Sequence, residues 1–200
     1  LLPRRLYQLT PDPAPVPRLF NFSAGPAVLP ESVLAIAGEH LLSLGETGIG
    51  ALEHSHRGDA FAEIIASAEA RIRRLADVPD DIAVLFLQGG ASLQFYMTAL
   101  NLLRPDEQAD YLVTGGWSQR ALKEAKRVGD AQAIWDDSEN GFRSVPQVGD
   151  YSVRDDAVYL HYTSNNTLYG TQFHHLPDSE GKLLLLDACS DIAGAPCDIS

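Results

Sequence analysis

The 200-residue chain is predicted to form an α/β fold with a mainly parallel sheet, and three observations support this prediction. From residue 82 onward, short continuous apolar runs, typical of strands buried on both faces, alternate with segments of helical periodicity. Turns rich in glycine and polar residues follow these runs, as they do where helices connect parallel strands. Hydrophobic residues make up 45% of the chain and charged residues 21%, which suffices for a core and excludes a disordered chain.

Two amphipathic helices are predicted before the sheet. The first starts at Pro30 and ends before Gly45, because glycine commonly terminates a helix. Its apolar stripe comprises Val33, Ala37, Leu41 and Leu44. The second is capped by Asp59 and ends before Pro79. Its apolar face comprises Phe61, Ile64, Ile65, Ala68, Ile72 and Leu75.

The rest of the chain is predicted to alternate between strands and helices. The predicted strands are 82–87, 111–114, 131–135, 157–162 and 183–186. The predicted helices are 92–103 and 118–128. The side chains expected to face the core from these helices are Leu93, Met97, Leu100, Leu122 and Ala125.

The domain organisation is simple at this level. Residues 1–20 contain five prolines and are predicted to be an extended leader. Residues 21–200 show no internal repeat and no linker, so we expect one domain. Its final segment, 195–200, stops before any helix closes the last crossover, so we expect this domain to be incomplete.

Charge and cysteine content limit the possible partners. The 15 basic and 27 acidic residues give a net charge of −12, which disfavours nucleic acid but permits a small anion held in one pocket. The longest apolar run is far shorter than a membrane span, so no membrane partner is expected. Cys189 and Cys197 lack the spacing of a zinc knuckle or a disulfide framework, which favours a reducing compartment.

The turn Gln88-Gly89-Gly90-Ala91-Ser92 is a candidate phosphate site. It lies between a predicted strand and a predicted helix, where two glycines let the backbone approach a ligand and the first helical N–H groups favour a dianion. Ser92 adds a hydroxyl donor. An ordinary turn with Ser92 as the helix cap explains the same residues.

Three further candidates follow predicted strands. Asp187 ends the last strand, where α/β sheets place ligands, and a buried carboxylate there needs a partner such as a protonated ring nitrogen. Trp117 offers a flat indole for stacking on a planar cofactor, and Thr167 offers a hydroxyl. The alternatives are that Asp187 stabilises a turn, that Trp117 packs against the core, and that Thr167 belongs to a polar loop whose side chains hydrogen-bond its own backbone.

Ser55-His56-Arg57-Gly58 precedes the second helix and can bind an anion. Arg57 presents a planar fork suited to carboxylate or phosphate, and His56 is a donor beside it. The alternative is a capping turn with a surface arginine. The histidines here and at 174–175 have no carboxylate or cysteine at ligand spacing, so no metal site is predicted.

A phosphate cradle, an acid, a flat aromatic and a hydroxyl at the strand ends match the requirements of pyridoxal 5′-phosphate. Six ordered segments then resemble the phosphoserine aminotransferase family over residues 20–200. They are Asn21-Phe22-Ser23-Ala24-Gly25-Pro26-Ala27, Ser55-His56-Arg57-Gly58, Gly89-Gly90-Ala91-Ser92-Leu93-Gln94-Phe95, Lys123-Glu124-Ala125-Lys126 after Trp117, His161-Tyr162-Thr163-Ser164-Asn165-Asn166-Thr167, and Asp187 with Asp198-Ile199-Ser200.

This resemblance implies the three-layer large domain of fold-type-I enzymes and transfer of an amino group between L-glutamate and 3-phosphohydroxypyruvate. It implies that Ala91 and Ser92 bind the cofactor phosphate, that Trp117 stacks on the ring and that Thr167 contacts its phenolic side. It also implies that Asp187 pairs with the pyridine nitrogen, and that His56 and Arg57 grip the substrate. A cytoplasmic homodimer, serine biosynthesis and, in many bacteria, pyridoxine biosynthesis complete the expectation.

The chain departs from the family pattern at its end. The family's Schiff-base lysine and small C-terminal domain follow the segment that ends at Ser200, and residues 21–50 are expected to pack towards that domain. Lys123, Lys126 and Lys182 match nothing catalytic, so we expect this chain alone to be inactive. There are two alternatives: another fold-type-I enzyme, such as a cysteine desulfurase or an alanine–glyoxylate transaminase, or a chain without the Schiff-base lysine that binds cofactor or a partner without turnover.

Overall fold

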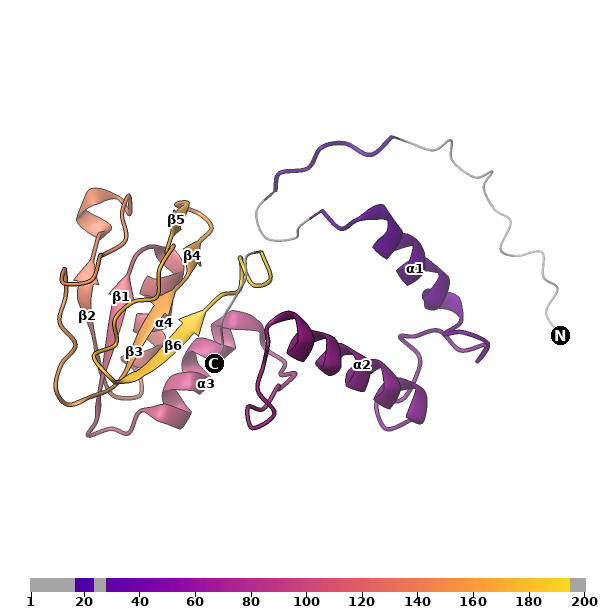
Figure 1. Ribbon diagram of the computed structural model, residues 1–200, viewed down its shortest axis with the longest axis horizontal. Helices are drawn as coiled ribbons and strands as arrows, with labels where there is room; N and C mark the ends of the chain where they lie inside the picture. The colour runs from indigo at the N-terminus through magenta and orange to yellow at the C-terminus, as the bar shows by residue number, and fades with distance from the viewer. Residues whose placement is uncertain (1–16, 24–27, 195–200) are drawn as a thin grey trace.

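Four parallel strands form the centre of the computed structural model, which describes residues 17–23 and 28–194 (Figure 1). The sheet order is β2-β1-β3-β6, and each neighbouring pair is parallel. The strands are β1 (Gln108–Val113), β2 (Asp130–Asp136), β3 (Ala157–Thr163) and β6 (Leu183–Asp187). Two short strands, β4 (Asn165–Asn166) and β5 (Thr171–Gln172), form an antiparallel hairpin after β3, and η2 (Ser138–Asn140) follows β2.

Helices α3 (Gly90–Leu102) and α4 (Gly116–Ala125) cover one face of this sheet. Phe95 and Ala99 of α3 and Leu122 of α4 are buried against Tyr111 and other residues that point to this side. The opposite face packs Leu112, Leu160 and Tyr162 against the connections that carry Val153 and Phe173. We call residues 90–194 the sheet region. The predicted α/β fold with a mainly parallel sheet is confirmed.

A buried ion pair closes the amino end of the sheet. The Asp110 side chain is fully buried and accepts hydrogen bonds from the Arg154 backbone N–H at 2.7 Å and from its Nε at 2.6 Å. The Arg154 guanidinium also donates to the Ala109 carbonyl at 2.9 Å and contacts the exposed Asp130 carboxylate at 3.1 Å. Arg154 thereby fixes the chain that enters β3 against β1 and β2.

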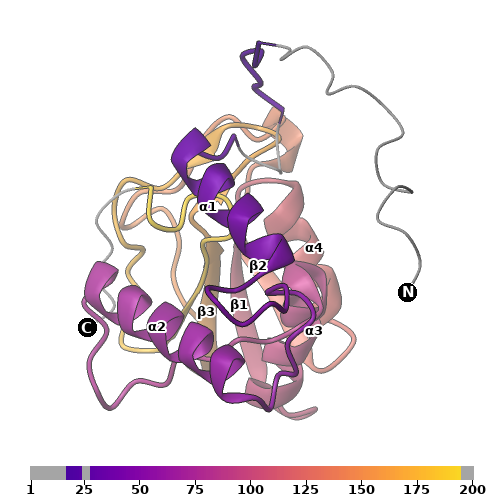
Figure 2. The ribbon, with the colours of Figure 1, turned by 90° about the vertical axis from the view of Figure 1, so that its right-hand side faces the viewer.

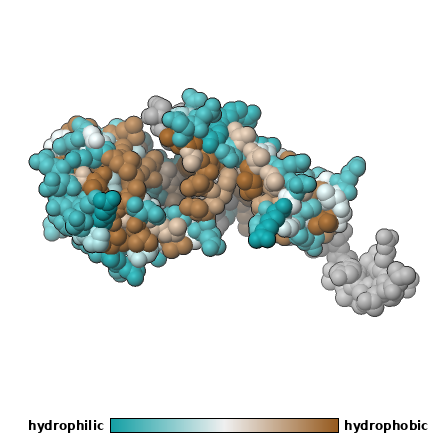
Figure 3. Space-filling model, turned by 90° about the horizontal axis from the view of Figure 1, so that it is seen from below, coloured by the Kyte–Doolittle hydropathy of each residue, from teal (hydrophilic) through white to brown (hydrophobic). Residues whose placement is uncertain are grey.

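The described residues 17–23 and 28–89, which we call the N-terminal region, lie beside the sheet, on the side of its edge strand β6 (Figures 1 and 2). They include α1 (Glu31–Leu42) and α2 (Asp59–Leu75), and neither helix contains a buried residue. Figure 3 shows hydrophobic residues gathered on the surface between the two regions. Within the N-terminal region only Gly50 is buried.

The structure corrects three predictions. Residues 82–87 form no strand, and Leu85 is 70% exposed, because no described strand lies beside them to complete their hydrogen bonds. In α3 the buried side chains are Phe95 and Ala99 rather than the predicted Leu93, Met97 and Leu100. Gly58, not Asp59, occupies the N-cap of α2.

The other predicted helices and strands are present, with ends that agree within three residues, and Leu122 and Ala125 face the core as predicted. Most of the leader predicted at 1–20, and the segment 195–200, lie outside the described residues. In the part of the chain that is described, no helix has the length and apolar character needed to cross a membrane.

Candidate functional site

Three strand ends and two helix starts meet at one edge of the sheet. Because β1, β3 and β6 are parallel, the residues that follow Val113, Thr163 and Leu186 emerge on the same side. Helix α3 precedes β1 and α4 follows it, so both helices begin at this edge. The edge therefore carries polar strand ends together with the positive ends of two helix dipoles.

The turn before α3 has the backbone of an anion site. Gly89 and Gly90 adopt φ values of +102° and +59°, which a residue with a Cβ rarely adopts. A Cβ on Gly89 would lie 2.3 Å from the Leu93 side chain, so this position has no space for one. Ala91 and Ser92 are in the first helical turn, where N–H groups have no intrahelical acceptor. Ser92 is exposed, and its hydroxyl is accessible to a ligand.

Asp187 ends β6 as a buried carboxylate. It is 9% exposed and opposite Thr163 of β3, whose Oγ1 donates to Oδ2 at 3.5 Å. The Cys189 backbone N–H donates to Oδ1 at 3.1 Å. Among the described residues no lysine or arginine forms an ion pair with Asp187, so its charge is available to a cationic ligand.

His161 is a residue of this site that the sequence reasoning missed as an individual candidate. Its ring is 6% exposed, stacks on Tyr111 with centroids 4.7 Å apart, and meets Phe95 of α3 edge-on at 6.3 Å. Burial lowers the pKa of His161 to about 4, although the nearby Asp187 charge acts in the opposite direction. Its Nδ1 is buried without a hydrogen-bond partner among the described residues. The alternation of side chains along a strand places residues 161 and 163 on the same face, and this pattern could have identified His161 from the sequence.

Trp117 and Thr167 occupy the loops after β1 and β3. Trp117 is half-buried at the start of α4, where both it and Ala91 pack against the same hydrophobic core. Thr167 is exposed in the turn between β4 and β5. Its neighbour Asn166 is fully buried and hydrogen-bonded to the loop that carries Trp117. The structure thus brings Ala91, Ser92, Trp117, Thr167 and Asp187 to one edge.

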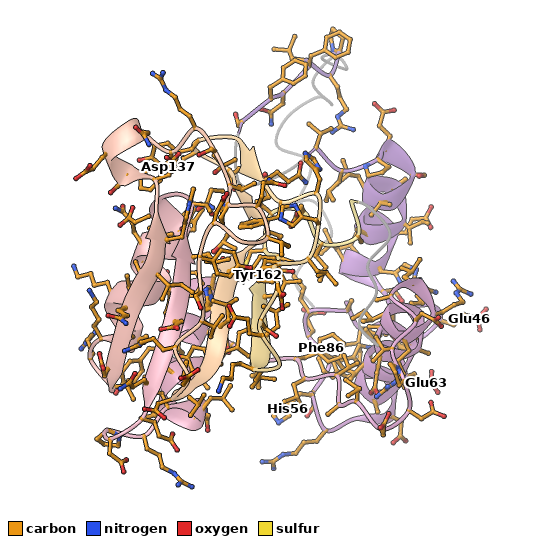
Figure 4. All side chains as sticks on the ribbon, turned by 60° about the vertical axis from the view of Figure 1, so that its left-hand side comes forward. Glu46, His56, Glu63, Phe86, Asp137 and Tyr162 are labelled. Carbon is orange, nitrogen blue, oxygen red and sulfur yellow. The ribbon has the colours of Figure 1, made fainter. Side chains whose placement is uncertain are left out.

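His56 and Arg57 are not joined to that edge. Both are exposed in the turn before α2, where the Arg57 backbone N–H donates to Ser55 Oγ at 3.2 Å. In Figure 4, His56 lies with the N-terminal region, on the opposite side of the molecule from Asp137. No hydrogen bond, ion pair or ring contact between described residues connects either side chain to the sheet. The described part of the chain also contains no group of three or more His, Cys, Asp or Glu able to hold a metal.

The donor set at the edge fits pyridoxal phosphate. The free N–H groups of the first turn of α3 suit a phosphate dianion, and the buried Asp187 carboxylate, without a cationic partner among the described residues, suits a protonated ring nitrogen. The half-buried Trp117 leaves part of its indole accessible for a flat ring. These are three different chemical requirements met at one place.

Comparison with known proteins identifies the family of the chain. The model of the family "Aminotransferase class-V" matches residues 19–200. The phosphoserine aminotransferase of Desulfotalea psychrophila is 46% identical over 183 residues, which are 92% of this chain and 50% of that protein. That of Stenotrophomonas maltophilia strain K279a is 44% identical over 91% of this chain and 50% of its own length. The chain therefore spans about half the length of these curated relatives.

Solved structures give the same result. A phosphoserine aminotransferase studied for radiation damage of its Schiff base has a TM-score of 0.88 and 40% identity, covering 92% of this chain and 51% of that one. A PLP-bound phosphoserine aminotransferase from Trichomonas vaginalis has a TM-score of 0.83 and 34% identity over 90% of this chain and 53% of its own. The predicted resemblance is confirmed, and the chain belongs to the class-V aminotransferase family.

Proposed function

We propose that this chain supplies the cofactor-binding part of a pyridoxal-phosphate-dependent phosphoserine transaminase, which moves an amino group between L-glutamate and 3-phosphohydroxypyruvate. The names of the relatives support the reaction. One structural observation carries the proposal. The buried Asp187 carboxylate has no cationic partner among the described residues, and it shares its sheet edge with the start of α3.

Each residue at the edge has a defined part in this proposal. The N–H groups of Ala91 and Ser92, with the Ser92 hydroxyl, bind the cofactor phosphate, and the Trp117 indole stacks on the ring. Asp187 accepts a hydrogen bond from the ring nitrogen and keeps that nitrogen protonated. Thr167 donates its hydroxyl to the phenolic side. Pyridoxal phosphate, when bound, supplies a conjugated ring that takes up the electron pair left at the substrate Cα.

The finer points of the proposal rest on the resemblance. His56 and Arg57 bind the anionic substrate, which in pyridoxine biosynthesis is a related phosphorylated four-carbon 2-oxo acid. Their exposure at the start of α2 leaves both side chains accessible to a ligand. We further propose a cytoplasmic homodimer. The cysteine pattern supports a reducing compartment, and the apolar side chains exposed on α1 and α2 support a second protein surface against them.

The three lysines of the chain are not at the candidate site. Lys123 and Lys126 are exposed at the far end of α4, and Lys182 precedes β6 at the amino end of the sheet. We therefore expect the 200-residue chain to bind the cofactor without a covalent link and to catalyse no transamination by itself.

Binding of pyridoxamine 5′-phosphate tests the cofactor site, because this form needs no lysine. We expect saturable quenching of tryptophan fluorescence in the wild-type chain and a 10- to 100-fold higher Kd for Asp187→Ala, since a charge-assisted hydrogen bond contributes about 1.5–3 kcal/mol. Asp156→Ala, an exposed carboxylate at the amino end of β3, is the matched control and should bind as the wild type does. Equal affinities of the Asp187 and Asp156 variants would contradict the assigned role.

A chimaera tests the reaction itself. The chain replaces the matched half of the Desulfotalea psychrophila relative, and release of 2-oxoglutarate from L-glutamate and 3-phosphohydroxypyruvate is measured. We expect activity that Asp187→Ala reduces by orders of magnitude. A chimaera that releases sulfur from cysteine, or transfers the amino group of alanine to glyoxylate, and does not act on L-glutamate with 3-phosphohydroxypyruvate would refute the proposed substrates.

A further inference from the structure

A buried polar network joins the loop after β1 to the loop after β3. Asn166 of β4 is fully buried, and its Nδ2 donates to Thr114 Oγ1 at 2.7 Å. Its Oδ1 accepts from the Ser118 backbone N–H at 3.5 Å. Thr171 of β5 adds a second connection, because its Oγ1 donates to the Thr114 carbonyl at 2.6 Å. Both strands of the hairpin are thus attached to the same residue of the β1 loop.

Ser118 holds the β1 loop in one conformation. Its buried Oγ accepts the backbone N–H groups of Thr114 and Gly115, both at 2.9 Å, and donates to the Gly115 carbonyl at 2.8 Å. A Cβ on Gly115 would lie 2.4 Å from Asn166 Cγ, so the loop and the carboxamide are in direct contact. The space between these two loops is filled by polar groups that satisfy one another.

The candidate cofactor residues are attached to the two ends of this network. Trp117 directly precedes Ser118, and Thr167 directly follows Asn166. The half-buried indole and the exposed hydroxyl therefore extend from one rigid unit, whereas Ala91 and Ser92 belong to the separate helix α3. A change in the network should affect contacts with the ring and leave contacts with the phosphate unchanged.

We infer that Asn166 is a positioning residue, which fixes the Trp117 loop to the Thr167 turn so that Trp117 and Thr167 contact the cofactor ring at the same time. This inference rests on the proposed function for its ligand. Asn166 itself is fully buried, so it acts through the two residues beside it rather than by touching the ring.

The experiment uses the chain with Trp135→Phe, which leaves Trp117 as its only tryptophan. The variants are Asn166→Ala, which removes both hydrogen bonds of the carboxamide, Thr114→Val, which removes one hydroxyl, and Thr114→Ser, which keeps it. Three readouts are compared: acrylamide quenching of Trp117 without ligand, the Kd of pyridoxamine 5′-phosphate, and binding of inorganic phosphate observed by phosphorus NMR.

We expect Asn166→Ala and Thr114→Val to raise the acrylamide quenching constant of Trp117 about twofold and the pyridoxamine 5′-phosphate Kd about tenfold. Inorganic phosphate binding should not change, and Thr114→Ser should behave as the parent. Asn165→Ala is the matched control in the same strand, because its side chain bonds Ser190 instead. Leu122→Ala, a core truncation in α4, controls for loss of stability alone and should leave the Kd unchanged.

The named outcomes separate this inference from the proposed function. Unchanged quenching and unchanged Kd in folded Thr114→Val would overturn the inference. A loss of inorganic phosphate binding as large as the loss of pyridoxamine 5′-phosphate binding would overturn it too. If Asn166→Ala does not fold, Thr114→Val and its serine counterpart decide. If the parent shows no saturable pyridoxamine 5′-phosphate binding, the proposed cofactor site fails, while ligand-free quenching still decides whether Asn166 holds the Trp117 loop.

Discussion

Helices α2 and α4 have similar amphipathic patterns and opposite burial. None of the 17 residues of α2 is buried, whereas Ser118, Ala121, Leu122 and Ala125 are buried in the 10 residues of α4. The difference lies in their neighbours, since α4 packs against β1, β2 and α3 while α2 lies beyond the sheet. An apolar stripe therefore indicates that a helix needs a covering surface, without indicating which part of a protein provides it.

The same contrast separates the two regions as wholes. The sheet region contains both hydrophobic clusters, and the described N-terminal region contains no buried side chain. Each fully buried leucine contributes about 1.5–3 kcal/mol to folding, so stability should be concentrated in the sheet region. Trp117 and Trp135 both lie there, and their fluorescence reports the unfolding of that region specifically.

The largest expected effect comes from comparing one ion pair in each region. Asp110 and Arg154 are joined at 2.6 Å with Asp110 fully buried, whereas Glu69 and Arg73 of α2 are joined at 2.9 Å on a partly exposed surface. Asp110→Ala should lower the free energy of unfolding by about 3–5 kcal/mol, because it leaves a partly buried guanidinium without its main partner. Glu69→Ala should cost less than about 0.5 kcal/mol. Urea unfolding measures both, followed by tryptophan fluorescence for the Asp110 variant and by far-ultraviolet circular dichroism, which includes the signal of α2, for the Glu69 variant.

The control for Asp110→Ala lies in the same cluster. Asp130 also contacts Arg154, but its side chain is 59% exposed, so Asp130→Ala should cost about 1 kcal/mol or less. If Asp110 and Asp130 variants lose equal stability, the distinction between buried and exposed partners is wrong for this cluster.

Two leucines provide the next comparison. Leu160 of β3 is fully buried, and Leu85 is 70% exposed in the segment predicted to be a strand. Leu160→Ala should cost about 3 kcal/mol through lost burial and the cavity left behind, and Leu85→Ala about 0.5 kcal/mol or less. A loss at Leu85 as large as at Leu160 would mean that residues 82–87 are packed in solution, as the sequence predicts. Circular dichroism should confirm that both variants keep their secondary structure.

Residues 82–87 also show what the sequence can and cannot predict. An apolar run predicts that a segment needs burial, and the four strands with parallel neighbours were found at nearly the predicted residues. The partner that completes a strand is a long-range property, and residues 82–87 have none among the described residues. Helix α3 fails for a related reason. Its apolar residues lie all around the helix, so periodicity did not single out Phe95 and Ala99 as the inward side.

The residues of the candidate site also fall into two groups, those that the sequence could predict and those that it could not. The ends of parallel strands and the starts of the helices that connect them converge by topology, so the placement of Trp117, Thr167 and Asp187 at strand ends and of Ala91 and Ser92 at a helix start was predictable from the order of helices and strands. Asn166 and His161 were not, because their importance depends on which polar atoms remain buried after packing. Sequence alternation can place such residues on a face, but only coordinates give their partners.

His161 gives the smallest of the three expected effects and the most specific one. In the unfolded chain its imidazole has the ordinary pKa near 6.5, and in the folded protein burial lowers the pKa to about 4. As the pH falls from 7, His161 therefore binds a proton in the unfolded state and remains neutral in the folded state. The contribution to stability is complete above pH 6.5 and is lost progressively towards pH 4, with about 2 kcal/mol lost between pH 7 and pH 5.

His161→Phe removes this titration while keeping an aromatic ring beside Tyr111 and Phe95. The decrease in unfolding free energy from pH 7 to pH 5 should be about 2 kcal/mol smaller in this variant than in the wild type, because the variant has no imidazole at this position to take up a proton on unfolding. His56→Phe is the control from the N-terminal region, where the side chain is exposed and folding removes little solvent from it. Equal pH dependence in the wild type and His161→Phe would show that His161 is solvated in the folded protein, and the contrast between a dry sheet region and an exposed N-terminal region would then fail at the candidate site itself.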